Sequence, residues 1–365
     1  MHSTYDVIVV GGGAIGAACA RELAAPGRSV LVIEDGGDTG QAWRAAAGML
    51  APQIEADGGD PMFSLAVAAR DHYQRLAAEL RDAVGVDLNL WQEGIARVAG
   101  TEGEAEALRA KVEWQKGQGL PCDWLDAEAV GRRWPWLGAM TGALWAPRDG
   151  ALDPEKLVGA LLADAERRGA VWVGDRALSV RQSGGKAIGV QGEKSSYSAG
   201  SVVVAAGAWS GLLEGLPRPL PVRPVRGQMA ALPWPSSIPR AIVYHKDCYL
   251  LARGGEAVIG STMEEAGFRA EVTPEGLGQI FGAVMVLCPS LFRAKVRRTW
   301  AGLRPVTPDG LPIVGEDPLM EGLWYATGHG RNGILLAGIT GVLVRQLIDD
   351  ERPAFDLRAF AADRF

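Results

Sequence analysis

The sequence predicts an α/β protein (α+β overall) in which a doubly wound, Rossmann-type sheet domain carries a second domain built on an antiparallel sheet. An apolar run at residues 5–10 leads into a glycine-rich turn and then a helical pattern. A second apolar run, 30–33, ends on an acidic residue. The chain becomes proline-rich and alternating from residue 216, then returns to glycine turns after 309. The first domain is therefore predicted to be discontinuous, with residues 1–85, 150–215 and 306–365, and the second to comprise 86–149 and 216–305.

The glycine-rich turn after the first apolar run reads Gly-Gly-Gly-Ala-Ile-Gly, the spacing of a dinucleotide site. Gly11 permits the tight turn, Gly13 lets the backbone approach a pyrophosphate, and Gly16 lets helix and strand pack closely. A helix starting at Ala14 would direct free N–H groups and its positive dipole end at the phosphates. Glu34, at the tip of the second apolar run, is placed to bind ribose hydroxyls. The turn alone would also serve an NAD-dependent dehydrogenase.

The remaining elements follow from local patterns. Apolar residues at helical spacing predict a helix over 62–84, and a charged pattern predicts another over 102–118. Asp153 followed by Pro154 is typical of a helix start, and this helix should end near residue 168. Strands are expected around 88–98, 171–173 and 201–204, and a long apolar helix is expected over 334–348.

Composition excludes several classes of function. The 365 residues are 48% hydrophobic, and the net charge of −6 comes from interspersed acids and bases, so neither nucleic acid nor an anionic membrane is an expected partner. The four cysteines form no CxxC pair and have no histidine at metal-ligand spacing, which predicts free thiols and no metal site. No apolar run is long enough to cross a bilayer, and no signal peptide precedes the glycine turn, so a cytoplasmic protein is expected.

Five motifs occur together and in order: residues 11–16, 45–50, 204–210, 300–305 and 328–335. Through them, over essentially its whole length, the chain resembles the glycine-oxidase and D-amino-acid-oxidase branch of FAD-dependent amine oxidases, with the bacterial glycine oxidases most similar. The resemblance implies FAD as cofactor. In the sarcosine-oxidase branch the flavin is tethered to a cysteine near the start of the segment that is 302–309 here. That segment has no cysteine, so noncovalent FAD is expected.

The physics of two motifs suits a flavin. Residues 45–49 have almost no side-chain bulk, so their backbone N–H groups can lie against a flat ring, although a small-residue helix start would look similar. Residues 328–335 form a turn into an apolar helix whose dipole would favour negative charge on the ring, although an ordinary glycine-capped helix would also fit. The residues expected to contact FAD are Gly11, Gly13, Ala14, Ile15, Gly16, Glu34, Asp35, Ala42, Trp43, Ala46, Ala47, Gly48, Met49, Ala177, Ala206, Gly207, Trp209, His329, Gly330, Arg331, Asn332, Gly333, Ile334 and Leu335.

Arg304 is the leading candidate for substrate recognition. Its guanidinium can clamp a carboxylate with two hydrogen bonds, and an unpaired arginine in this apolar strand would be costly. A structural ion pair is the alternative, but the resemblance places the family's carboxylate-binding arginine here. Tyr249 matches a pocket tyrosine, while Arg331 and Met263 match residues near the substrate. Arg331 could instead pair with an acid, Met263 could fill core space, and Tyr249 could be an ordinary half-buried strand residue.

One position departs from the family pattern. Where the most similar relatives carry a histidine two residues before the pocket tyrosine, this chain has Asp247. This departure weakens the inference that the preferred amine is the same as theirs.

The resemblance implies oxidation of a small amino acid or N-substituted glycine by hydride transfer to flavin, with no acid or base residue required. Glycine is the leading substrate, with sarcosine and D-alanine as further possibilities. The products are an imine, then a 2-oxo acid with ammonia or an amine, and hydrogen peroxide from dioxygen. A homo-oligomer and a role in supplying the thiazole of thiamine are also implied. The alternatives are a D-amino-acid or D-hydroxyproline dehydrogenase that reduces a quinone, and a flavin-binding protein without catalysis.

Overall fold

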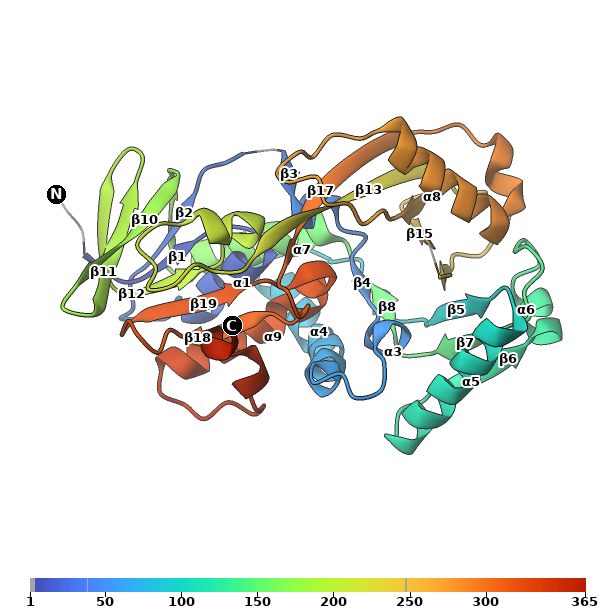
Figure 1. Cartoon of the computed structure of the whole chain (residues 1–365), viewed down its shortest axis with the longest axis horizontal. Helices are drawn as coiled ribbons and strands as arrows, with labels where there is room; N and C mark the ends of the chain where they lie inside the picture. The colour runs from blue at the N-terminus through green and yellow to red at the C-terminus, as the bar shows by residue number, and fades with distance from the viewer. Residues whose placement is uncertain (1–3, 38, 247) are drawn as a thin grey trace.

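The computed structural model describes residues 4–37, 39–246 and 248–365. Two large sheets dominate it: one near the N-terminus on the left of Figure 1, and one on the right that carries β13, β17 and β5. This is the mixed α/β fold that the sequence predicts.

The first sheet has a parallel core built from five strands. In spatial order these are β9 (Val171–Gly174), β2 (Val30–Glu34), β1 (Thr4–Val10), β12 (Ser196–Val204) and β19 (Leu323–Thr327). Three antiparallel strands extend it: β10 (Ala177–Ser183), β11 (Lys186–Gly192) and β18 (Ile313–Glu316). The central strands β1, β2 and β12 carry buried runs of Val, Leu and Ile, which is typical of a parallel sheet covered on both faces.

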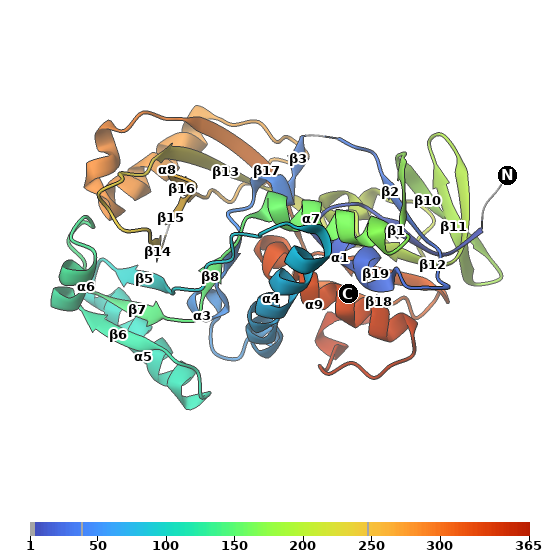
Figure 2. The same cartoon turned by 180° about the vertical axis from the view of Figure 1, so that it is seen from behind.

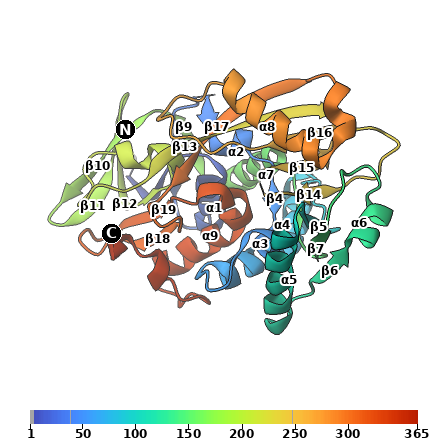
Figure 3. The same cartoon turned by 45° about the vertical axis from the view of Figure 1, so that its right-hand side comes forward.

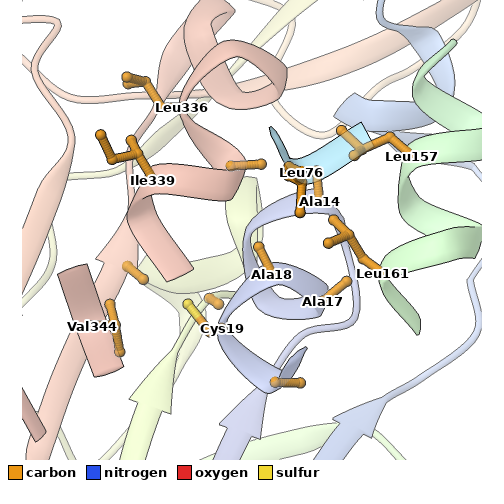
Figure 4. Close-up of a cluster of buried hydrophobic side chains, with 14 of the residues drawn as sticks. Ala14, Ala17, Ala18, Cys19, Leu76, Leu157, Leu161, Leu336, Ile339 and Val344 are labelled. Atoms are coloured by element: carbon orange, nitrogen blue, oxygen red, sulfur yellow. The ribbon is translucent and has the colours of Figure 1, made fainter. Parts of the chain in front are cut away.

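Small residues let the helices over this sheet approach one another closely. Helix α1 (Ala14–Leu23) lies between α7 (Pro154–Arg167) and α9 (Gly333–Ile348), and α4 (Phe63–Val84) packs on α9. Figure 3 shows α1 beside α9, and Figure 4 shows the α1 side chains between Leu157 and Leu161 of α7 and Leu336, Ile339 and Val344 of α9. A Cβ on Gly341 would lie only 2.6 Å from the Ala18 carbonyl oxygen, so glycine is needed at this crossing.

The second sheet is mainly antiparallel, with two parallel pairings. Its order is β3 (Gly40–Gln41), β17 (Arg298–Val306), β13 (Arg223–Pro233), β16 (Glu256–Gly260), β15 (Tyr249–Arg253), β14 (Ile242–Tyr244), β5 (Ile95–Ala99), β7 (Gly142–Ala146) and β6 (Asp123–Asp126). The pairs β14–β5 and β17–β3 are parallel. Each joins segments far apart in sequence, so no hairpin imposes an antiparallel direction on them.

Helices cover both faces of the second sheet. Apolar residues of α8 (Pro274–Leu287) and α6 (Ala127–Arg133) pack on one face, and those of α5 (Glu102–Gly117) pack on the other together with Ile54. Figure 2 shows α8 beside β13 and β16, with α5 and α6 beside β6 and β7.

Several short elements complete the structure. They are α2 (Ala42–Ala45), β4 (Met49–Leu50) paired with β8 (Gly150–Ala151), α3 (Pro52–Glu55), and five 3₁₀ turns: η1 (Gly207–Leu212), η2 (Pro289–Arg293), η3 (Gly330–Asn332), η4 (Arg358–Phe360) and η5 (Ala362–Arg364). We propose that each large sheet with its helices forms one domain, with the boundaries predicted from the sequence, except that β3 of the second sheet lies within the predicted first domain.

The predicted long helices are confirmed as α4, α5, α7 and α9. Asp153 caps α7 as expected, because its Oδ1 accepts the backbone N–H of Glu155 at 3.1 Å. The strand predicted over 88–98 is wrong in its first part, since β5 starts only at Ile95. Asn89 and Gly94 both have positive φ values, 51° and 96°, which break an extended strand there.

All four cysteines are buried, and none of them forms a disulfide bond. No group of three or more His, Cys, Asp or Glu side chains among the described residues could hold a metal ion. No helix within the described ranges is both long enough and apolar enough to cross a bilayer.

Candidate active site

A cavity of about 920 Å³ is lined by residues of both sheets. Its volume is at the upper end of the range typical of cofactor and ligand sites. Of the predicted cofactor residues, it is lined by Gly11, Gly13, Ala14, Ile15, Glu34, Asp35, Ala42, Trp43, Ala46, Ala47, Gly48, Met49, Ala177, Ala206, Gly207, Trp209, His329, Gly330, Arg331, Asn332, Gly333 and Ile334. Arg304, Tyr249 and Met263 line it as well.

Two predicted contact residues do not line the cavity. A Cβ on Gly16 would overlap the Gly11 carbonyl oxygen, so this glycine serves the packing of α1 on the turn. Leu335 is only 4% exposed, because its side chain points from α9 into the core under the first sheet. Their predicted contact with the cofactor stays a prediction.

The glycine turn has the geometry that a phosphate site needs. Gly11 has φ +103°, and a Cβ there would lie 2.5 Å from the Ala205 carbonyl oxygen. Helix α1 follows with Gly13 as its N-cap and no side-chain cap, so its first N–H groups are available to a ligand. Glu34 accepts the Gly12 N–H at 2.6 Å and the Gln41 side-chain amide at 3.0 Å. Burial raises the pKa of Glu34.

The small-residue segment between α2 and β4 is held in place by the second sheet. Trp300 Nε1 donates to the Ala45 carbonyl at 3.2 Å, and Arg253 Nη1 donates to the Ala47 carbonyl at 2.8 Å. Gly48 has φ +80°, and a Cβ there would overlap the Leu152 carbonyl oxygen. The backbone of this segment is thus fixed along the cavity wall.

The start of α9 brings a second helix N-terminus to the cavity. Its N-cap, Asn332, makes no side-chain cap hydrogen bond, so the first N–H groups of α9 are not capped by a side chain. His329 is 2% exposed, and its Nε2 lies 3.1 Å from Thr340 Oγ1, while Nδ1 has no partner among the described residues. Burial lowers the pKa of His329 to about 3, so the ring is neutral at pH 7.

The depressed pKa of His329 predicts a pH-dependent stability. Because the folded pKa of about 3 lies below the unfolded value near 6.5, the unfolded chain binds the proton first as the pH falls. We expect this histidine to reduce the free energy of unfolding by about 1.4 kcal/mol per pH unit between pH 6.5 and about pH 3. Urea unfolding at several pH values should show a shallower decline for His329→Gln than for the wild type. Equal slopes would contradict the prediction.

Arg304 lies in β17 and points into the cavity from the second sheet. Nη2 donates to Ser261 Oγ at 2.7 Å and Nη1 to the Thr262 carbonyl at 3.1 Å. No carboxylate of the described residues forms an ion pair with it. Burial lowers the pKa of Arg304, although a guanidinium remains charged at any ordinary pH. A Cβ on Gly227, in the neighbouring strand β13, would overlap the guanidinium, so glycine makes room for it.

Tyr249 lies beside Arg304 at the start of β15. Its hydroxyl donates to Met229 Sδ at 3.0 Å, and its side chain is 6% exposed. Burial raises the pKa of Tyr249, so the hydroxyl stays protonated and can act as a donor. The thioether is a weak acceptor, and a carboxylate would be a stronger one.

Arg331 takes the alternative that the sequence left open for it, a pair with an acid, whereas Met263 does not take its own alternative, a place in the core. Arg331 Nε forms an ion pair with Glu55 Oε2 at 2.9 Å, with its side chain 54% exposed. Met263 is 63% exposed, so it does not fill the core. Asp247 lies outside the described residues.

Several residues of the site were missed from the sequence. Glu55 lines the cavity at the end of α3, and Tyr244 in β14 donates a hydrogen bond of 3.4 Å to it. Ser261 and Thr262 hold Arg304. No motif marks these positions, because their roles depend on contacts between segments far apart in the chain.

A parallel sheet with a glycine turn, beside a cavity that holds an arginine without a carboxylate partner among the described residues, is typical of dinucleotide-dependent oxidoreductases. Residues 6–347 match the family model DAO, FAD dependent oxidoreductase. The chain is 36% identical to glycine oxidase of Geobacillus kaustophilus (strain HTA426) and 32% identical to glycine oxidase of Bacillus subtilis (strain 168). Each alignment covers 100% of this chain and 98% of the relative.

The solved structures agree with the sequence relatives. The crystal structure of glycine oxidase from Geobacillus kaustophilus matches with a TM-score of 0.93 at 35% identity, covering 100% of both chains. The chain therefore belongs to the DAO family of FAD-dependent oxidoreductases, and its cofactor is FAD.

Proposed function

We propose that the protein oxidises a small amino acid or an N-substituted glycine, with glycine as the leading substrate and dioxygen as the electron acceptor. One observation carries the proposal: Arg304 is a guanidinium without a carboxylate partner among the described residues, in the same cavity as the glycine turn. A buried cation in this setting favours an anionic ligand. Amino acids supply a carboxylate next to the carbon that is oxidised.

The residues of the cavity fit noncovalent FAD. The pyrophosphate would lie at Gly11 and Gly13, where the backbone is bare and the first N–H groups of α1 are free. Glu34 would bind the adenosine ribose. The ring would lie between the fixed segment 45–49 and the start of α9, whose N–H groups favour negative charge. This assignment covers the predicted cofactor residues that line the cavity.

FAD supplies the chemistry by accepting a hydride from the substrate carbon. Arg304 would bind the substrate carboxylate through two parallel hydrogen bonds, and Tyr249 would donate a third. These contacts fix the orientation of the α-carbon, which is the main contribution of the protein to the proposed hydride transfer. No side chain is assigned the removal of a proton, because the substrate reacts as the neutral amine. The imine product then hydrolyses to a 2-oxo acid with ammonia or an amine.

A peroxide-coupled screen under air tests the proposed acceptor. The yellow protein is incubated with glycine, sarcosine and D-alanine, and peroxide is measured against substrate consumed. We expect equal amounts of peroxide and imine-derived product. A dehydrogenase that reduces a quinone, acting on D-amino acids or D-hydroxyproline, would turn over only with an added acceptor, and that outcome would replace the oxidase assignment. A homo-oligomeric assembly, a cytoplasmic location and a role in thiamine supply stay predictions.

A further inference from the structure

The cavity contains a second guanidinium besides Arg304. Arg331 comes from η3, just before α9, and in its ion pair with Glu55 the Arg331 side chain is 54% exposed while that of Glu55 is 14% exposed. Because the guanidinium is partly in solvent, its pairing with Glu55 is screened, and an incoming carboxylate can compete for it. Burial lowers the pKa of Arg304, and the charges of Glu55 and Arg331 also act on it, so the three groups lie within electrostatic reach.

Glu55 is held far more firmly than Arg331. Its helix, α3, is capped by Asp149, whose Oδ2 accepts the backbone N–H groups of Gln53 at 3.0 Å and Ile54 at 3.1 Å. Asp149 is fully buried and paired with the equally buried Arg70 at 2.8 Å.

The other end of α3 is held as well. Lys111 Nζ and Arg97 Nη1 both donate to the Ile54 carbonyl, at 2.8 and 3.0 Å. Glu55 is therefore fixed on a short, tied helix. Arg331 projects from a single turn on a long side chain, so Arg331 is the member of the pair that can turn towards a ligand.

We propose that Arg331 forms a second anion subsite, through which the protein accepts N-substituted glycines that carry a second carboxylate on the nitrogen substituent. The proposal rests on the proposed function: Arg304 takes the glycine carboxylate, and the second carboxylate exchanges with Glu55 on Arg331. Glu55 weakens this subsite when it is paired, so it sets the selectivity between charged and neutral nitrogen substituents.

Two substrates that differ only in charge test the subsite. The probes are N-(2-carboxyethyl)glycine and its amide, N-(2-carbamoylethyl)glycine, and the quantity measured is the ratio of their kcat/KM values. Because both are assayed on the same preparation, the fraction of enzyme that holds FAD cancels. We expect Arg331→Gln to lower the acid-to-amide ratio about tenfold and Glu55→Gln to raise it about tenfold, which corresponds to about 1.4 kcal/mol each.

Two further variants exclude simpler explanations. The double variant Glu55→Gln/Arg331→Gln should have an acid-to-amide ratio well below that of Glu55→Gln alone. In both proteins the charge of Glu55 is absent, so this difference would show that Arg331 attracts the second carboxylate directly and does not act only by neutralising Glu55. Lys186→Gln removes the same unit charge from an exposed pair with Glu321, 2.7 Å apart on the first sheet, and should leave the ratio unchanged.

An unchanged ratio in Arg331→Gln, or a lower one in Glu55→Gln, would overturn the subsite while oxidation of glycine or sarcosine still supported the proposed function. A wild-type protein that oxidises none of these amines would refute the proposed function, and the subsite with it.

Discussion

Arg304→Ala should raise KM for every accepted amino acid by a factor of 100 or more, with FAD content unchanged. Removing one partner of a buried, hydrogen-bonded charge pair costs roughly 3–5 kcal/mol, and each ~1.4 kcal/mol is tenfold in binding. Arg304 forms no ion pair with the described residues and lies on the opposite sheet from the glycine turn. The substitution should therefore weaken substrate binding and leave FAD binding unchanged.

Steady-state kinetics with glycine, sarcosine and D-alanine measure the effect, with the flavin absorbance as the internal control. Arg304→Lys is the matched variant: it keeps the charge but loses the planar fork, so its KM should lie between those of the wild type and Arg304→Ala. If the KM values of Arg304→Ala were the same as those of the wild type, the arginine would be structural, which was the alternative left open from the sequence.

Gly13→Val should abolish tight FAD binding while the fold is kept. A Cβ at Gly13 would meet only the Trp43 ring edge, at 3.3 Å, so the protein itself can accommodate a side chain there with a small shift. The side chain would, however, occupy the place where the backbone is proposed to approach the pyrophosphate. We expect FAD affinity to fall by about 2 kcal/mol or more, which is at least thirtyfold.

Flavin content of the purified protein and titration of the apoprotein with FAD measure this loss, and circular dichroism confirms the fold. Gly103→Ala is the control, because nothing lies within 4 Å of a Cβ there, on helix α5 over the second sheet. A Gly13→Val protein that keeps its full flavin content would place the pyrophosphate elsewhere.

The fold was predictable where local physics decides the structure. The cap at Asp153, the helical spacing from Phe63 to Val84 and the glycine turn at Gly11 each act within a few residues, and the structure has them where the sequence predicts them. The parallel pairing of β14 with β5 was not predictable, since it joins segments nearly 150 residues apart that no local pattern connects.

The residues of the site also fall into those that the sequence predicts and those that it does not. Arg304 was predicted from two sources, the chemistry of a guanidinium in an apolar strand and the resemblance to the family. Glu55 was missed because its role arises only when α3 contacts Arg331 and Tyr244 in the folded chain. Leu335 was predicted to contact FAD; the helical period turns its side chain into the core, and the contact stays a prediction. Residues that act through tertiary contacts therefore needed the structure.

Anaerobic titration of the yellow protein with glycine tests the central claim most directly. Glycine should bleach the flavin absorbance at about 450 nm without any added acceptor, because hydride transfer to bound FAD needs neither dioxygen nor a quinone. Glycinamide, which has the same amine and α-carbon but no carboxylate, should bleach it far less because Arg304 has nothing to bind. Equal bleaching by both, or none by glycine, sarcosine or D-alanine, would contradict the account.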